Sequence, residues 1–162
     1  IAPDRLFERD HAVELGGDRG NRSPRILGYG HSCGPGAVAV FDAASGVLFA
    51  GGFADEQRIP DVQDAELPGW LRALDALRKL PARIVVPGHG APTTPAVFER
   101  NARYLRALDA RVRELLERGV PLSALADAAE LPAYAGWDQY DTIHRRNASL
   151  LYLRLEREQL YK

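Results

Sequence analysis

Apolar and polar residues follow two different periods along this chain. In the first half, short β-type runs at residues 25–27, 37–41 and 47–50 predict strands. The last two of these runs are joined by residues 42–46, which end in glycine and predict a hairpin loop. A looser alternation over residues 5–15 predicts one more strand, and it contains His11, for which a structural or surface position is favoured.

A helix followed directly by a strand is predicted in the middle of the chain. Residues 67–80 place leucines and a tryptophan at helical spacing, with arginine, lysine and aspartate on the opposite face. Pro81 ends this pattern, and the apolar run Ile84-Val85-Val86 follows. A run without alternation is typical of a strand buried on both faces, and the proline and glycine that follow it predict the end of that strand.

The remainder of the chain has a helical pattern. Thr94, placed before a proline, is the predicted N-cap of a long helix that runs to Gly119. Residues 122–131 predict a short helix, and Asp138 is the predicted cap of the last one. His144 lies near the apolar stripe of that last helix, which indicates a packing or surface role.

Composition excludes several classes of partner. The chain has 162 residues, of which 46% are hydrophobic and 27% charged, and its net charge is −1. Neither nucleic acid nor a membrane surface is an expected partner, because the basic excess and the long apolar run that these would favour are missing from the sequence. Cys33 is the single cysteine, so no internal disulfide forms, and the compartment stays open. Because Ile1 stands first, we expect a cleavage point or the start of a fragment.

Two histidines stand in glycine-rich loops, each after a predicted strand. His31 lies in GYGHSCGPG and His89 in RIVVPGHG. Loops at the carboxyl ends of strands are where α/β proteins usually hold ligands, although each histidine taken alone is also compatible with a simple turn. Cys33 is either a thiolate ligand or, more commonly in such a turn, a small packed side chain. The acids of residues 53–66 belong to a polar loop that is either solvated or contributes ligands or a lid.

Three segments in fixed order carry a family resemblance. The histidine segment GHSCGPGAVAVF, the hairpin end VLFAGG at residues 47–52 and the later PGHG resemble the second half of the metallo-β-lactamase fold. The resemblance implies an α/β fold: residues 1–92 as the C-terminal half of an αββα sandwich, and residues 93–162 as a helical C-terminal extension packed on it. Residues 57–61 and the block that ends in PGHG are similar to a subgroup of metallohydrolases associated with periplasmic quinoprotein systems.

The resemblance also implies a chemistry. It makes His31 a ligand of a first metal and His89 a ligand of a second, with zinc as the expected metal and one or two ions per site. Zinc-activated water would then hydrolyse an ester, thioester or lactone-like bond of a small-molecule substrate. If the subgroup resemblance holds the protein is periplasmic, and otherwise it is cytoplasmic.

Two departures from the family pattern limit this expectation. Gly52 stands where the family carries a metal-bridging aspartate, so either Asp55 replaces it through a shifted loop or the second metal is weak or absent. The HxHxDH motif, which supplies the remaining ligands, occurs nowhere in the chain. We therefore expect the chain to be inactive alone, with the remaining ligands outside it. The alternative is a non-catalytic binding or assembly module that has lost the second metal site.

The same resemblance predicts a partner. Half of an αββα sandwich leaves one face of its sheet uncovered, which favours association. The expected partner is the missing N-terminal half of the fold or a second copy of this chain. A more remote alternative is a helical interaction protein in which the histidine loops are only turns.

Overall fold

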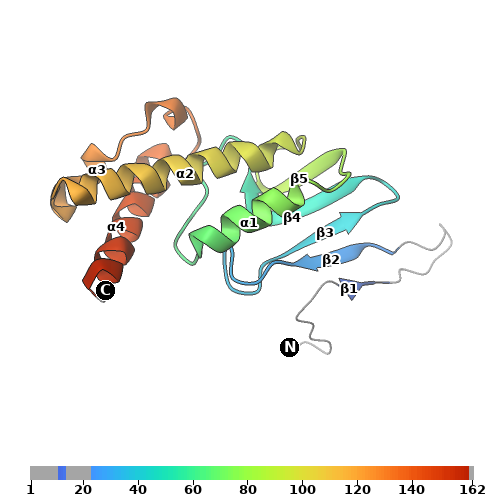
Figure 1. Ribbon diagram of the computed structural model, residues 1–162. Helices are drawn as coiled ribbons and strands as arrows, with labels where there is room; N and C mark the ends of the chain where they lie inside the picture. Colours follow the sequence, from blue (N-terminus) through green and yellow to red (C-terminus); the bar gives the residue numbers. More distant parts are fainter. Residues whose placement is uncertain (1–10, 14–22, 161–162) are drawn as a thin grey trace, which may run out of the picture.

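The protein has a mixed α/β fold in which helices cover one face of a single sheet (Figure 1). The computed structural model describes residues 11–13 and 23–160. Five strands form the sheet, and their order in space, β1-β2-β3-β4-β5, is also their order in the chain. The strands are β1 (His11–Ala12), β2 (Arg25–Gly28), β3 (Val38–Asp42), β4 (Val47–Asp55) and β5 (Ile84–His89). Most of the predicted strand at residues 5–15 lies outside the described residues.

The sheet is antiparallel from β1 to β4 and parallel between β4 and β5. The strands predicted at residues 25–27, 37–41 and 47–50 are confirmed, but β4 continues to Asp55 through residues that were predicted to be a loop. It continues because Phe53 and Ala54 are fully buried, and its pairing with β5 shifts register on both sides of Gly51.

β5 also runs further than predicted. Pro87 does not end the strand, which continues through Gly88 to His89. Proline is tolerated here because β5 is the last strand of the sheet, so that a missing N–H donor on the outer side breaks no pairing within the sheet. The backbone N–H of Glu56 donates to the carbonyl of His89 at 2.9 Å, which ties the strand end to β4.

The helices follow the predicted pattern with shifted ends. They are α1 (Leu67–Leu77), α2 (Ala96–Glu117), α3 (Leu122–Ala128), the 3-10 helix η1 (Pro132–Tyr134), the π-helical turn η2 (Tyr140–His144) and α4 (Arg145–Leu160). Two predicted caps are wrong. Pro95 rather than Thr94 occupies the N-cap of α2, and no side chain caps that helix. Asp138 precedes η2 and pairs with Arg58 at 2.9 Å instead of capping α4, which continues directly from η2.

One face of the sheet forms the core with the helices. Leu48 and Val85 are fully buried on that face, and Trp70 of α1 and Phe98 of α2 pack into the same apolar cluster. The Trp70 indole N–H donates to the carbonyl of Phe53 at 2.9 Å, so α1 is also hydrogen-bonded to the sheet. α3 and α4 lie beyond the end of the sheet, where α4 packs on both α2 and α3 (Figure 1). Arg111 of α2 also donates to the carbonyl of Ala128 at the end of α3.

In the described part of the chain, the opposite face of the sheet is open and apolar. Val38, Phe49 and Ile84 are 44%, 49% and 46% exposed. Phe49 pairs with Val40 on one side and with Val86 on the other, so apolar side chains continue across three strands on this face. The prediction that the Ile84–Val86 run is buried on both faces is therefore wrong for this chain, because the described helices cover one face only.

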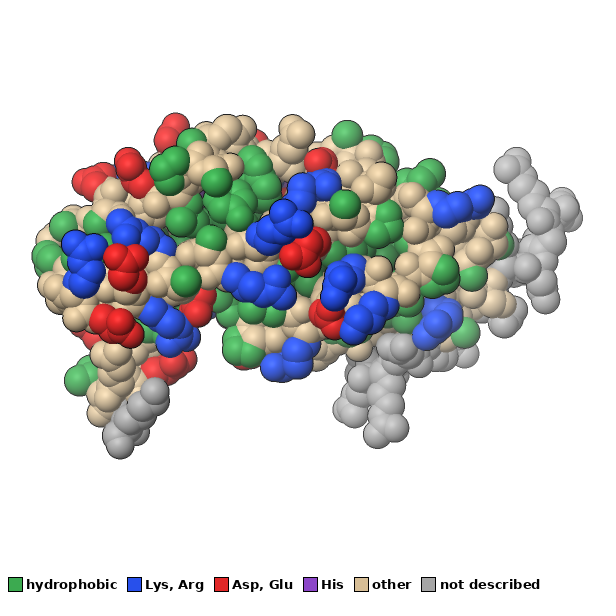
Figure 2. Space-filling view, turned by 45° about the horizontal axis from the view of Figure 1, so that its top comes forward, with side chains coloured by type: hydrophobic (Ala, Val, Ile, Leu, Met, Phe, Trp, Pro, Cys, Tyr) green, Lys and Arg blue, Asp and Glu red, His purple; other side chains and the backbone are tan. Residues whose placement is uncertain are grey.

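The helical side of the molecule carries mixed charge. Arginine and acidic side chains alternate along α2 in the pairs Arg103–Glu99, Arg113–Asp109 and Arg118–Glu114, each four residues apart. Figure 2 shows basic and acidic side chains interspersed over this side of the molecule. No helix of the described chain is both long enough and apolar enough to span a membrane.

Candidate functional site

The two predicted histidines lie at the same end of the sheet. β3 is antiparallel to both β2 and β4, and β5 is parallel to β4, so β2, β4 and β5 all run in one direction. His31 follows the carboxyl end of β2, and His89 is the last residue of β5. Topology therefore places both loops at the carboxyl edge of the strands, where α/β proteins place their ligands.

His89 is held by a buried carboxylate. Its Nδ1 lies 2.7 Å from Oδ1 of Asp55. The Asp55 side chain is 7% exposed, whereas that of His89 is 58% exposed. An ionised carboxylate can only accept, so Nδ1 of His89 carries the proton and, in the neutral ring, Nε2 carries the lone pair. In metal sites, a carboxylate that does not itself bind the metal often orients a ligating histidine in this way.

Asp55 is itself fixed by a fully buried amide. The Asp55 N–H donates to Oδ1 of Asn101 at 2.9 Å, and Nδ2 of Asn101 donates back to the Asp55 carbonyl at 2.8 Å. Burial raises the pKa of Asp55, while the hydrogen bond and charge of His89 oppose that rise. Sequence reasoning missed Asn101. The sequence feature that could have identified it is an isolated asparagine among the apolar, inward-facing positions of α2, between Phe98 and Leu105.

His31 is exposed and bonded to a backbone carbonyl. Its Nε2 donates to the carbonyl of Asp64 at 2.8 Å, and because a carbonyl can only accept, the neutral ring carries its lone pair on Nδ1. The neighbouring Ser32 carbonyl accepts from the backbone N–H of Glu66 at 2.8 Å. Two hydrogen bonds therefore join the His31 loop to the segment that precedes α1.

The His31 loop also packs tightly against α1. A Cβ atom placed on Gly69 would lie 2.2 Å from the carbonyl oxygen of His31. A backbone oxygen at that distance excludes any side chain. Gly69 is thus required where the first turn of α1 approaches the loop, and its N–H is capped by Glu66 at 2.5 Å.

Gly52 of β4 lies against the side chain of Cys33, which stands two residues after His31. A Cβ atom on Gly52 would meet Sγ of Cys33 at 3.5 Å, an ordinary contact distance. Burial raises the pKa of the Cys33 thiol, and the nearby Asp55 charge adds to the rise. In the metal-free chain the thiol is therefore protonated near neutral pH, as is usual for a small packed cysteine side chain.

The described residues do not by themselves close a metal site. No three side chains of His, Cys, Asp or Glu in the described part of the chain are grouped so that they share one ion. A zinc site normally needs at least three protein ligands. Asp55, which the sequence offered as a replacement for the bridging aspartate, uses Oδ1 to bind His89. Any metal held by His31 or His89 therefore requires ligands from outside the described residues.

Other acids and histidines of the sequence serve the fold. Asp61 pairs with Arg146, and Glu56 pairs with Arg100, so these two acids of the segment at residues 53–66 are both engaged in ion pairs. His144 is 1% exposed and donates from Nε2 to the carbonyl of Ala129 at 2.9 Å, which confirms a packing histidine. The side chain of His11 lies outside the described residues.

Comparison with known proteins gives a fold but no sequence family. No family model matches the chain, and no curated protein matches it. Among solved structures, it is similar to a metallo-beta-lactamase family protein from Thermus thermophilus, with 22% identity and a TM-score of 0.66 over 94% of this chain and 48% of that one. It is also similar to a metallo-beta-lactamase from Pontibacter korlensis, with 22% identity and a TM-score of 0.58 over 65% of this chain and 50% of that one. The chain spans about half the length of each.

Proposed function

This chain has the carboxy-terminal part of the metallo-β-lactamase fold, and we propose that it is the carboxy-terminal portion of a metal-dependent hydrolase. One observation carries the proposal. His31 and His89 lie at the same edge of the sheet, and each has one ring nitrogen in a hydrogen bond that leaves the other nitrogen with the lone pair. Two pre-oriented imidazoles at the carboxyl ends of strands suit metal ligation.

The proposed metal is zinc, as one or two ions, with the remaining ligands supplied by an HxHxDH segment outside this chain. Bound zinc supplies a water with a pKa near neutrality as the nucleophile. The residues of this chain would orient two ligands: Asp55 fixes the ring of His89, and the Asp64 carbonyl fixes the ring of His31. The proposed substrate is a small molecule with an ester, thioester or lactone-like bond.

The open face of the sheet supports the proposal of a partner. Phe49 and Ile84 are each nearly half exposed, and buried apolar area contributes about 25 cal/mol per Å². The first half of the same fold is the partner we propose, because the chain spans only half of the solved structures that share its fold. A second copy of this chain is the other candidate.

One observation favours a second candidate function. Gly52 offers no carboxylate, Cys33 occupies the adjacent space, and Asp55 is engaged with His89. If Oδ2 of Asp55 does not bridge, the described residues offer no bridging ligand for a second metal. The alternative is therefore a non-catalytic binding or assembly module that keeps the fold and at most one metal.

Metal analysis of the complete protein, with the first half of the fold present, tests the proposal. We expect about one or two zinc ions per chain, in line with catalytic zinc sites. His31→Ala and His89→Ala should each lower that number, while His144→Gln, which removes a histidine bonded to Tyr104 and to the Ala129 carbonyl, should leave it unchanged. Equal zinc content in both ligand variants and the parent would refute the ligand assignment. Zinc binding without hydrolysis of ester, thioester and lactone probes would favour the module.

A further inference from the structure

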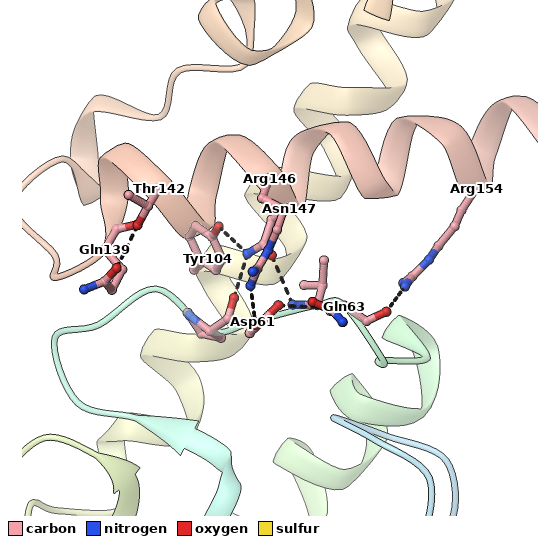
Figure 3. A network of polar contacts seen from close by, with 10 residues as sticks. Asp61, Gln63, Tyr104, Gln139, Thr142, Arg146, Asn147 and Arg154 are labelled. Atoms are coloured by element: carbon pink, nitrogen blue, oxygen red, sulfur yellow. Dashed lines mark hydrogen bonds and ion pairs between the residues drawn. The ribbon is translucent and has the colours of Figure 1, made fainter.

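Helix α4 holds the segment at residues 60–65, which lies between β4 and α1 (Figure 3). Nδ2 of Asn147 donates to the carbonyl of Pro60 at 2.7 Å, and Oδ1 of Asn147 accepts from the N–H of Val62 at 3.1 Å. Asn147 is fully buried, and the neighbouring Arg146 pairs with Asp61. The first half of this segment is therefore fixed to α4.

Arg154, two turns further along α4, holds the second half. Its guanidinium donates to the carbonyl of Ala65 at 3.0 Å and also to the carbonyl of Gln63. The carbonyl between these two, that of Asp64, accepts from Nε2 of His31 at 2.8 Å. Three successive carbonyls are thus divided between two partners, the outer two bonded to Arg154 and the middle one to His31.

These three carbonyls belong to a backbone turn that its own hydrogen bond closes. Gln63 and Asp64 form a turn, in which the backbone N–H of Ala65 donates to the carbonyl of Val62 at 3.2 Å. Arg154 bonds the carbonyls on both sides of Asp64, and the turn hydrogen bond closes the same segment, so the Asp64 carbonyl stays directed at His31. A guanidinium suits this task, because its planar fork holds two acceptors at once, whereas an ammonium acts as a point charge.

From this geometry we propose that Arg154 is the positioning residue for His31. It acts through the backbone of residues 63–65 and selects the ring tautomer that keeps the proton on Nε2 and the lone pair on Nδ1. The positioning itself stands on the contacts above, and its effect on metal binding rests on the proposed function. In this way the helical extension, far from His31 in sequence, sets the state of a ligand in the sheet domain.

The test is the ring tautomer of His31, measured by ¹⁵N NMR on the metal-free complete protein, with His31→Gln used to assign the signal. Arg154→Met keeps the apolar stem and removes both donors, and Arg154→Lys keeps the charge without the fork. Arg145→Met is the matched control, because Arg145 also lies on α4 but pairs with Asp127.

We expect the Nε2–H form of His31 to dominate in the parent and in Arg145→Met, to mix with the Nδ1–H form in Arg154→Met, and to be intermediate in Arg154→Lys. An unchanged tautomer in a folded Arg154→Met variant would overturn the proposal, and Arg154→Lys provides the same test if the methionine variant does not fold. Zinc affinity should fall about 10–100-fold in Arg154→Met. A tautomer change without a change in zinc affinity would uphold the positioning and reject the metal role of His31.

Discussion

The carboxylate of Asp55 lies 2.7 Å from Nδ1 of His89, and the two residues end neighbouring parallel strands. Asp55 is buried, and its backbone N–H and carbonyl are both hydrogen-bonded to the side chain of Asn101. Most of the His89 side chain is exposed. The buried Asp55 carboxylate thus holds the exposed His89 ring by Nδ1, while Nε2, on the other side of the ring, is not bonded to it. A carboxylate partner of this kind fixes the orientation and the tautomer of the histidine ring.

Replacing the anchor should loosen the ring. In the complete protein, Asp55→Ala should weaken zinc binding about 10–100-fold, because the ring of His89 loses its orientation and its preferred tautomer. Competition with a chelator measures this change. Asp75→Ala is the control, since Asp75 pairs with Lys79 and Arg78 on the exposed side of α1. An affinity equal to that of the control would show that Asp55 does not orient His89.

Restoring a carboxylate at position 52 should add a metal. Gly52→Asp places its Cβ at an ordinary 3.5 Å from Sγ of Cys33, so the first atom of the side chain fits without a clash. If the complete protein holds one zinc ion because it lacks the bridging ligand, the variant should hold about two. Metal analysis measures the difference, with Gly136→Asp as the control. A parent that already holds two ions would contradict this explanation.

Adding a single methyl group to α1 should disturb the His31 loop. Alanine normally stabilises a helix over glycine by about 1 kcal/mol, but at position 69 its Cβ would lie 2.2 Å from the His31 carbonyl. Overpacking of this kind costs about 1–3 kcal/mol, so Gly69→Ala should lower the free energy of unfolding in urea. Gly136→Ala meets no atom within 4 Å and should have little effect. A stabilised Gly69→Ala variant would show that the loop is free to move.

Stability should decrease below about pH 6.5 because of His144. Burial lowers the pKa of His144 below its ordinary 6.5, and the charge of Arg145 adds to that effect, against the hydrogen bond to Ala129. As the pH falls below 6.5, His144 becomes protonated in the unfolded chain but stays neutral in the folded chain. The free energy of unfolding therefore falls with decreasing pH until the folded-state pKa is reached. Urea unfolding over this range measures the slope. His144→Gln should flatten it, and an unchanged slope would assign the effect to another group.

The open sheet face should drive association of this chain in isolation. Phe49 is 49% exposed at the centre of that face, between Val40 and Val86. Phe49→Asp should therefore reduce association in sedimentation velocity. Leu153→Asp is the matched control, because Leu153 is 43% exposed on α4. A compact, stable monomer of the parent chain would contradict the predicted interface.

Local pattern was sufficient for most of the elements. The β-type runs at residues 25–27 and 37–41 and the helical spacing at 67–80 predicted β2, β3 and α1, because the period of apolar residues is set by the local backbone geometry. The glycine-rich surroundings of His31 and His89 identified them as candidate ligands, which stays a prediction. The fold that their order implied is confirmed, while the quinoprotein-associated subgroup remains a prediction.

Element ends depended on contacts that pattern does not contain. β4 extends to Asp55 because Phe53 and Ala54 are buried in the core. β5 continues beyond Pro87 because it lies at the edge of the sheet. Asp138 pairs with Arg58, 80 residues away, rather than capping α4. Each outcome is set by burial or pairing with a distant segment, which can outweigh local preference.

The sequence by itself determined which residue types stand in the loops, and the tertiary structure decided what holds them. His89 is oriented by Asp55, which is 34 residues away, and His31 by the Asp64 carbonyl, which is 33 residues away. Asn101 and Arg154 support these contacts from helices that the sequence pattern marked only as packing elements. Hydrogen-bond partners are fixed by direction and distance in three dimensions, and periodicity along the chain carries neither.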